Sequence, residues 1–582
     1  MAHAAPTSAA RIRVPWAWLV ALAVLVWAVS AWHLDFICDD AFISFRYAKH
    51  LAAGEGLVFN LGSHQPVEGY TNFLWVVYLS LFEPGGYLHT RFLDTPTIAR
   101  LSSGLCGLIL LLQMAAYLRR RPDLSDAARA AGLLFLATFP PMALWSSGGL
   151  ATMPVALFIF LAFRTLLDST GLHTDSKTGP AAIAERRFPG IWTGIWAGLW
   201  GVLAVLTRAD GFLWIAGICL LAALSPRCRE RSFRRSLFTF ATLTALALAV
   251  HFSWRHNYYG EWLPNTARVK TGLSALRLER GAKYVLAYLC AVPSAGLALA
   301  CACYALRPPR TRRTRRTRGT RVEPSANGDA ETRLLAFQGL ALFLGTAVYA
   351  LWVGGDFMPL GRFLFPAVPF LALAFAAGLG RLGANGKAAR PWAAAIVGAS
   401  AIILSGLSLA DIHPVPLALR QALDFRWNEP HYQTELEMRA GMDERARNWT
   451  IQGRALALYT RPDETMILSA VGAQGYYSNL FLYDNYGLVT REVAQRDAPL
   501  KRSSPGHDKR VPSDFFFDRH PDYLGSLLSH PYLPETDGLP AAPGQSWYEH
   551  PWGKRVTIER YPLYPEDGFA AGLELRLLRF KR

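Results

Sequence analysis

Membrane-length apolar runs recur through the first 410 residues of this chain. A helix of about 20 apolar residues crosses the hydrocarbon core of a bilayer, where only helices and closed barrels satisfy their backbone hydrogen bonds. The composition agrees, because 52% of the 582 residues are hydrophobic and only 18% are charged. The sequence therefore predicts a polytopic α-helical membrane protein rather than an ordinary soluble one.

Basic loops give the predicted spans a direction, because loops rich in Lys and Arg stay in the cytoplasm. About eleven spans, with the N-terminus inside, place every strongly basic loop on the cytoplasmic side. The predicted spans are residues 14–34, 97–118, 127–145, 153–167, 191–206, 212–224, 237–254, 284–306, 334–352, 363–379 and 392–409. The first follows Arg11 and Arg13 and is longer than a signal-peptide core, so we expect it to be retained.

The short run Thr71–Phe82 decides the number of spans. It has only about a dozen residues, which is short for a span and typical of an interfacial helix. If it stays outside, the next helix ends in the cytoplasm at Arg119, Arg120 and Arg121; if it crosses, these arginines lie outside. We therefore predict an exterior loop over residues 35–95 that carries interfacial helices.

Two further segments complete the predicted organisation. The net charge of +17 and the arginine-rich residues 307–321 would suit a nucleic acid, but this stretch lies between two apolar runs. It indicates a basic cytoplasmic linker loop at 307–327. After residue 410, short apolar runs such as Thr465–Val471 and Leu480–Tyr483 alternate with turn-rich sequence. Residues 411–582 therefore predict a soluble extracytoplasmic α/β domain.

The predicted topology gathers polar groups at the outer surface: Asp39 with Asp40, Arg208 with Asp210, residues 255–270, and Asp356 with Arg362. Ionisable groups at a membrane boundary are costly to desolvate, and groups of both signs commonly bind a charged ligand or move protons. The plainer alternative is that each is a helix-end residue whose side chain reaches water.

The adjacent carboxylates Asp39 and Asp40 suit general-base chemistry, because mutual repulsion and partial burial raise the pKa of one of them. Asp40 equally suits the N-cap of the amphipathic helix that follows. Arg46 and Tyr47 lie six and seven residues after Asp40 and, on a helix, point roughly to a common polar side. The residues alone leave both interpretations of the pair open.

Basic and aromatic side chains are also expected at this surface. Guanidinium groups match phosphate well, so the basic residues could hold an anionic headgroup, although ordinary anionic lipids would also contact them. They are Arg208, Arg268, Lys270 and Arg362. The aromatic residues suit sugar faces or an interfacial belt. They are Tyr258, Tyr259, Trp262 and Trp352.

A divalent metal is a further candidate, because carboxylate-rich exterior loops can bind hard cations. The residues that would supply it are His33, Asp35, Asp39, Asp40, His50 and His64. Their spacing matches no standard metal motif. The sequence therefore leaves the metal unassigned. No P-loop, dinucleotide fingerprint or G-x-S-x-G motif occurs.

Several stretches resemble the GT-C glycosyltransferases related to the mycobacterial terminal arabinofuranosyltransferase of cell-wall arabinan. They are DDAFISFRYAKHLAAGEGLVFN, VEGYTNFLW, LTRADG, YYGEWLPNTARVKTG and GGDFMPLGRFLFP. The later stretch GAQGYYSNLFLYDNYGLVTREVA resembles part of the extracytoplasmic C-terminal domain of that family. The resemblance implies a GT-C catalytic membrane domain over residues 1–410 in the bacterial cytoplasmic membrane.

The resemblance also implies a reaction. A sugar, arabinofuranose by analogy, would move from a polyprenyl-phosphate carrier to a hydroxyl on a cell-surface glycan, lipid or protein. Asp39 would be the base and Asp40 its partner, with the basic residues above on the donor phosphate. The residues expected to bind substrate are Arg46, Tyr47, Glu68, Tyr70, Asn72, Asp210, Tyr259, Asn265 and Asp356. Relatives often have Gly-Leu-Glu-Thr after the third helix, whereas this chain has Ala151 in place of the acidic residue.

The chemistry of such a donor fits these groups. A lipid phosphate is a good leaving group, so one base and several cations suffice for a single displacement with inversion. A transporter or flippase of lipid-linked sugars is the alternative, and it predicts polar residues midway through spans and paired broken helices. In a third interpretation the exterior domain binds carbohydrate or an assembly partner, and the membrane part is a scaffold.

Overall fold

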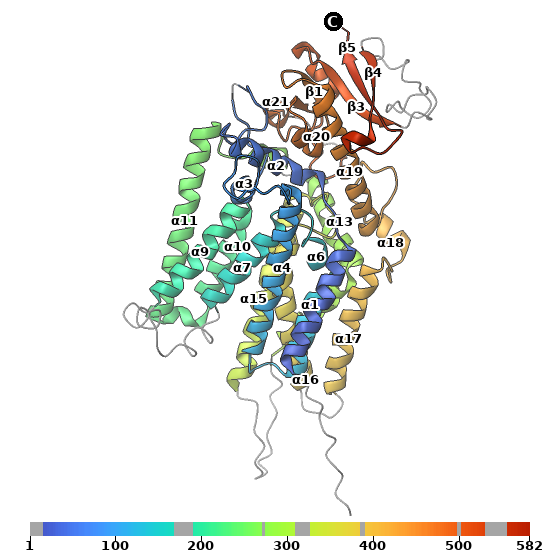
Figure 1. Ribbon diagram of the computed structural model, residues 1–582. Coiled ribbons are helices and arrows are strands. Elements are labelled where there is room, and N and C mark those ends of the chain that lie inside the picture. Colours follow the sequence, from blue (N-terminus) through green and yellow to red (C-terminus); the bar gives the residue numbers. More distant parts are fainter. Residues whose placement is uncertain are drawn as a thin grey trace, which may run out of the picture.

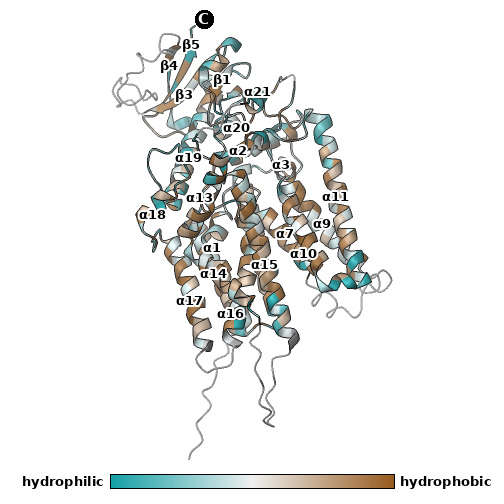
Figure 2. Ribbon diagram, turned by 180° about the vertical axis from the view of Figure 1, so that it is seen from behind, coloured by the Kyte–Doolittle hydropathy of each residue, from teal (hydrophilic) through white to brown (hydrophobic). Residues whose placement is uncertain are grey.

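A helical bundle carries a smaller domain with a β-sheet at one end (Figure 1). The computed structural model describes residues 15–63, 65–167, 190–270, 274–308, 326–384, 390–497, 502–529 and 556–581. Hydrophobic residues dominate the bundle, and hydrophilic residues gather in the smaller domain and at helix ends (Figure 2). The predicted class, a polytopic helical membrane protein with a C-terminal α/β domain, is confirmed.

Every predicted span contains helix. The helices of the bundle are α1 (Trp16–His33), α4 (Thr95–Arg119), α5 (Asp126–Thr138), α6 (Pro140–Leu144), α7 (Thr152–Leu167), α9 (Ile191–Thr207), α10 (Gly211–Leu224), α11 (Arg231–Tyr259), α13 (Ala275–Ala291), α14 (Pro293–Ala305), α15 (Ala326–Val353), α16 (Val368–Ala384) and α17 (Arg390–Leu409). Among the described residues, six helices are long and apolar enough to span a membrane, or seven if one bent pair counts as a span. Three shorter apolar helices accompany them, so the number eleven stays a prediction.

Two predicted spans are not continuous helices, and proline is the reason in both. The span predicted at 284–306 is wrong as a single helix, because α13 and α14 meet at 96° just before Pro293. The span predicted at 127–145 also breaks, at Phe139, where Pro140 and Pro141 begin α6. Proline lacks a backbone N–H and its ring clashes with the preceding turn of a helix, so it ends the earlier helix. Among the described residues, α13 with α14 is the one bent pair that is long and apolar enough to count as a span.

Two short helices, α2 (Asp39–Ala52) and α3 (Phe73–Ser80), lie between the bundle and the C-terminal domain (Figure 1). With 8 residues α3 is too short to span a bilayer, as predicted for this run. Most of α2 is buried, including Arg46 and His50, because the C-terminal domain packs over it. Helix α2 is therefore a covered element of the domain junction.

The C-terminal domain begins with the long helix α19 (Glu435–Tyr459). A capping box starts it, in which the Thr434 side chain accepts the Glu437 N–H and the Glu437 side chain accepts the Thr434 N–H. The strands are β1 (Thr465–Leu468), β2 (Phe481–Asp484), β3 (Tyr523–Ser529), β4 (Val556–Pro562) and β5 (Glu574–Phe580). Their order is β2-β1-β3-β5-β4, with β1 parallel to β2 and β3 and the other pairs antiparallel. The apolar runs near 465 and 480 thus form the two parallel strands β1 and β2.

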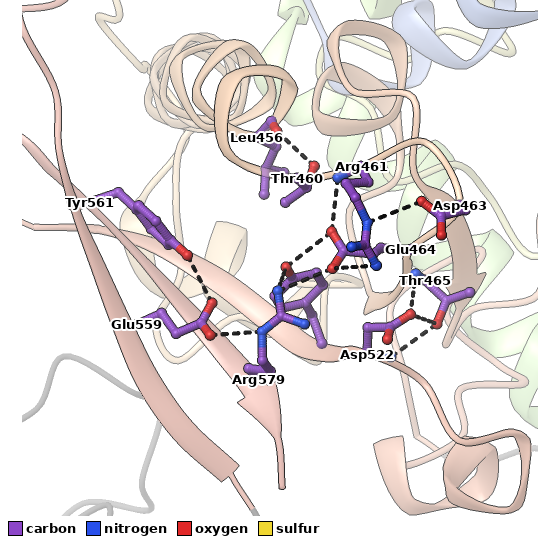
Figure 3. Close-up of polar contacts among 11 residues, drawn as sticks. Leu456, Thr460, Arg461, Asp463, Glu464, Thr465, Asp522, Glu559, Tyr561 and Arg579 are labelled. Carbon is purple, nitrogen blue, oxygen red and sulfur yellow. Dashed lines mark hydrogen bonds and ion pairs between the residues drawn. The ribbon is translucent and has the colours of Figure 1, made fainter. Parts of the chain in front are cut away.

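A polar cluster links neighbouring strands at one end of this sheet (Figure 3). The Arg579 guanidinium donates to Glu464 at 3.1 Å and to Glu559 at 2.7 Å. Asp522 accepts the backbone N–H of Thr465 at 2.9 Å. Since Arg579 is 29% exposed, we expect its pairs to contribute little stability and to serve mainly the register of the strands.

Buried ion pairs join the domain to the bundle. The Asp508 carboxylate pairs with Arg280 at 2.7 Å and with Arg277 at 3.2 Å, and all three side chains are 2% exposed. Arg426 likewise pairs with Glu435 at 2.9 Å and donates to the carbonyl of Phe357 at 3.0 Å. Breaking one partner of such a pair leaves a buried charge, so these contacts fix the domain rigidly over α2.

Candidate active site

A cavity of about 490 Å³ lies where the bundle meets the C-terminal domain. One part of its wall is charged. That part is formed by Asp40, Arg208, Asp210, Arg255 and Arg362. The rest is mostly apolar. It includes Phe212, Leu213, Phe252, Leu263, Trp352, Val353 and Phe363. Phe212, Leu263 and Trp352 are 44%, 42% and 65% exposed, so the apolar wall continues onto the outside of the bundle.

Each of the three cavity arginines is paired with a carboxylate. Arg362 donates two hydrogen bonds of 2.7 Å to Asp356, a bidentate pair. Arg208 donates to Asp210 at 2.9 and 2.6 Å in the same manner. Such forks fix the plane of a guanidinium group before any ligand arrives. The orientation of both guanidinium groups is therefore fixed by their carboxylate partners.

The third arginine, Arg255, lies at the end of α11, with its Nε 2.7 Å from the buried carboxylate of Glu68. Burial raises the pKa of Glu68 to about 7, although Arg255 opposes the shift. For Asp210, burial alone would raise the pKa, but the attraction and hydrogen bonds of Arg208 bring it below its usual value. Asp210 therefore stays ionised, whereas Glu68 titrates near neutrality.

The two aspartates of the predicted catalytic pair face different surroundings. The Asp40 side chain is 45% exposed, lines the cavity and has its Oδ2 3.9 Å from Nη1 of Arg362. Asp39 does not line the cavity. It accepts the backbone N–H groups of Gly472 at 3.0 Å and Ala473 at 2.7 Å, in the helix α20 (Gly472–Tyr477) of the C-terminal domain. Only Asp40 is thus in contact with the cavity.

The helix-cap alternative for Asp40 is wrong. Helix α2 begins at Asp39, and its N-cap is Cys38, whose side chain makes no capping hydrogen bond. Both aspartates lie in the first turn, where negative charge is favoured by the helix dipole. Burial nevertheless raises the pKa of Asp39 to about 7, against the lowering effect of its backbone hydrogen bonds.

Arg46 and Tyr47 do not reach the cavity, which corrects their expected contact with substrate. Arg46 is 1% exposed and donates to the carbonyls of Phe59 at 2.7 Å, Gly475 at 2.9 Å and Leu480 at 2.7 Å. Tyr47 donates to the carbonyl of Val67 at 2.5 Å. The Arg46 side chain thus joins Phe59 to the C-terminal domain, and the Tyr47 hydroxyl holds the backbone at Val67 and Gly69.

Of the other residues predicted to bind substrate, some line the cavity and the others contact the residues around it. Asp210, Tyr70 and Asn72 line the cavity. The Tyr70 hydroxyl lies 3.1 Å from that of Tyr259, and the Asn72 amide donates to Ser44 at 3.0 Å. The remaining four do not line it. Glu68 and Asp356 hold arginines, Tyr259 donates to the Leu57 carbonyl at 2.9 Å, and Asn265 donates its backbone N–H to the Glu68 carbonyl at 3.0 Å.

The predicted phosphate group of four basic residues is only partly assembled. Arg208 and Arg362 line the cavity, but Arg268 does not, because it turns to Glu261 in an ion pair. The side chain of Lys270 lies outside the described part of the structure. The third arginine that lines the cavity is Arg255. Sequence could have identified it, because it directly follows the predicted span 237–254 and lies just before the matching stretch that begins at Tyr258.

Leu488 is a second missed residue. It lines the cavity from the C-terminal domain, at the tip of a turn that follows β2. Buried Asp484 shapes this turn by accepting the N–H groups of Tyr486 at 2.8 Å and Val489 at 3.1 Å. No charge or spacing in the sequence distinguishes Leu488 from a core leucine, although it lies in the last matching stretch.

The predicted metal ligands do not converge. Among the described residues, no group of three or more His, Cys, Asp and Glu side chains could hold a metal ion. Asp35 pairs with Arg100, and the His50 ring lies 2.9 Å from the Val58 carbonyl. His64 lies outside the described residues. The described residues of the candidate set therefore do not fit a divalent metal.

Comparisons with known proteins add a domain and a set of similar folds. Residues 435–564 match a family model described as a domain of unknown function (DUF8728). No curated protein matches the chain. Among solved structures, ArnT from Cupriavidus metallidurans bound to undecaprenyl phosphate has 13% identity and a TM-score of 0.48, covering 97% of each chain. Its apo form has 15% identity and a TM-score of 0.49 over the same coverage.

An archaeal oligosaccharyltransferase, AglB from Archaeoglobus fulgidus in complex with an inhibitory peptide and a dolichol-phosphate, is a further similar structure. It has 13% identity and a TM-score of 0.44, covering 81% of this chain and 65% of its own. Likenesses at these identities and TM-scores do not identify a function.

Proposed function

We propose that this chain is a membrane glycosyltransferase of the GT-C class. It transfers a sugar, arabinofuranose by its sequence resemblance, from a polyprenyl-phosphate carrier to an acceptor hydroxyl on a cell-surface glycan, lipid or protein. The observation that carries the proposal is a cavity in which the half-exposed carboxylate of Asp40 lies beside fixed arginines and an apolar wall that reaches the bundle surface.

The donor fits the two halves of this cavity. Its phosphate would be bound by the preorganised guanidinium groups of Arg208, Arg255 and Arg362, which are already oriented by their carboxylate partners. Its polyprenyl chain would lie along Phe212, Leu263 and Trp352, where the cavity wall becomes membrane-facing surface. We leave Arg268 out of this site because it is paired elsewhere.

The reaction is one displacement. An Asp40 carboxylate oxygen takes the proton of the acceptor hydroxyl as that oxygen bonds to the anomeric carbon. The bond from this carbon to the phosphate oxygen breaks, and the polyprenyl phosphate leaves with the electron pair. The arginines stabilise the phosphate charge in both states. With a single step the anomeric configuration inverts.

Asp39 acts in this scheme as a positioning residue. Its two backbone hydrogen bonds to α20 fix the first turn of α2, and Asp40 is the next residue in that turn. We therefore assign the base role to Asp40, the partner in the predicted pair. The domain of unknown function thereby belongs to the active site, because it holds Asp39 and supplies Leu488.

A transfer assay tests the proposal. The purified chain in proteoliposomes is given polyprenyl-phosphate-linked sugars and an envelope extract, and mass spectrometry follows the acceptor. The expected result is release of polyprenyl phosphate and a matching mass gain on the acceptor. Movement of intact lipid-linked sugar across the bilayer, with no transfer, would contradict it and favour the flippase.

A further inference from the structure

A second cavity of about 470 Å³ lies on the opposite side of α2 from the first. Lys49, near the end of α2, lines it, whereas Asp40 lines the first cavity. Nine residues separate the two, which is about two and a half helical turns and places them on opposite faces. Segment 82–95 and helix α20 form the rest of the wall, so the cavity exists only where the C-terminal domain meets the membrane part.

Aromatic and polar side chains share this wall. Phe82, Tyr476 and Tyr477 provide ring surface. The polar residues carry both signs. They are Lys49, Glu83, His89, Arg91 and Asp94. The mixture disfavours a purely apolar ligand, and the buried Glu83 carboxylate disfavours a multiply charged anion.

The acidic groups of this cavity are already engaged, and Lys49 donates to the Tyr476 carbonyl at 3.2 Å and to Asn479 at 3.3 Å, whereas two other donors have no such partner. Tyr476 donates to Glu83 at 2.9 Å, and Asp94 accepts the backbone N–H of Thr97 at 3.0 Å. Among the described residues, no hydrogen bond or ion pair occupies the Arg91 guanidinium or the Tyr477 hydroxyl. The cavity therefore offers free donors beside aromatic rings.

The rim of the second cavity places it at a membrane surface. Tyr87 and Phe92 are 96% and 94% exposed, and Leu88 and Leu93 are 52% and 42% exposed. The helix α4, long and apolar enough to span, begins at Thr95, directly after this rim. Exposed aromatic residues beside the end of a span are typical of the membrane interface. A ligand in this cavity would thus be held where a membrane-attached molecule passes.

We infer that the second cavity binds a saccharide unit of the acceptor, at a distance from the hydroxyl that reacts. Sugar hydroxyls accept hydrogen bonds from Arg91, Lys49 and Tyr477 and donate to Glu83, and the sugar ring packs on the aromatic residues. The cavity is thus a remote subsite that contributes affinity without touching the reacting atoms. The role of this ligand as acceptor rests on the proposed function, whereas its binding does not.

Binding and kinetics together test the inference. The probe is a mixture of oligosaccharides released from the envelope of the source cells, and its binding to the full chain in nanodiscs is followed by saturation-transfer NMR. Arg91→Ala and Tyr477→Ala are the test variants. The matched control is Tyr564→Ala, which removes a 46% exposed tyrosine of the same domain that does not line the cavity.

The two test variants are expected to weaken oligosaccharide binding and to raise the acceptor KM by at least about tenfold, with kcat and the donor KM unchanged. Wild-type binding and acceptor KM in both variants would overturn the inference while transfer itself persisted. The inference would also be overturned if the two variants lost bound phosphatidylglycerol, in nanodiscs that contain this lipid, while oligosaccharide binding stayed intact, because a lipid headgroup would then be the ligand. Failure of the proposed function is distinguishable, since oligosaccharide binding would stay sensitive to both variants in a chain without transfer activity.

Discussion

Asp39 and Gly472 are in direct contact across 433 residues of sequence, through a 3.0 Å hydrogen bond from the Gly472 N–H to the Asp39 carboxylate. A Cβ atom at Gly472 would lie 2.0 Å from the Asp39 carbonyl oxygen and 2.7 Å from its Cγ, so only glycine fits. The contact joins the C-terminal domain to the helical turn that presents Asp40 to the cavity.

Gly472→Ala is therefore expected to impair transfer, because α20 must move and Asp39 loses its hydrogen bonds to the backbone of α20. We expect kcat to fall at least about tenfold, since small displacements of catalytic groups are costly. Binding of polyprenyl phosphate, measured by native mass spectrometry, should be retained. The control is Gly441→Ala in α19, where the new methyl group meets only the Arg445 side chain at 3.5 Å. Equal kcat values for the two variants would contradict the claim that the contact between Asp39 and Gly472 positions Asp40.

Stability should fall with rising pH in a way that depends on Asp39. Burial raises its pKa from 3.8 to about 7 in the folded chain, so the folded state binds the proton more tightly than the unfolded state. This contribution is complete below about pH 4 and is lost as the pH rises through 7. Thermal unfolding of wild type and Asp39→Asn from pH 4 to 8 measures it. The Tm of wild type should fall more over this range, and parallel curves would refute the assignment.

Arg362→Lys tests the phosphate site. Lysine keeps the charge but cannot reproduce the two hydrogen bonds to Asp356 or the planar fork toward a phosphate. We expect the donor KM to rise and kcat to fall, together lowering kcat/KM by roughly 10- to 100-fold. Arg447→Lys, at a 71% exposed arginine of α19, is the matched control and should behave as wild type. A donor KM unchanged in Arg362→Lys would remove this residue from the site.

Leu488→Trp tests whether the C-terminal domain closes the cavity. A larger side chain at the tip of the turn would fill part of the 490 Å³ that substrates need. We expect at least a tenfold loss of transfer with little change in Tm, because Leu488 is only partly buried and lines the cavity. Leu458→Trp, at a 54% exposed position of the same domain, is the control. Wild-type rates for Leu488→Trp would show that this residue lies away from the substrates.

Much of this architecture follows from local sequence. Apolar length and basic loops predict where helices lie, and the alternation after residue 410 predicts the α/β domain. The charged groups Asp40, Arg208, Asp210 and Arg362 could be grouped because each ends or follows a predicted span. Pro293 breaks one span at a point where hydropathy alone shows a continuous run.

Long-range contacts explain what sequence patterns could not predict. Arg46 resembles a site residue on its own helix, but its partners Gly475 and Leu480 lie more than 400 residues away. A long-range contact also distinguishes Asp39 from Asp40, because Asp39 is bound to α20 whereas Asp40 lines the cavity. Leu488 carries no chemical signature at all, and only the turn built by Asp484 brings it to the cavity.

The most direct test of the central claim compares Asp40→Asn with wild type in sugar transfer from a polyprenyl-phosphate donor. Asparagine keeps the size of the side chain but cannot take the acceptor proton, so we expect kcat to fall by about 10²- to 10⁴-fold while polyprenyl-phosphate binding persists. Asp39→Asn should lose less activity, because its carboxylate does not line the cavity. Wild-type transfer by Asp40→Asn would contradict the account.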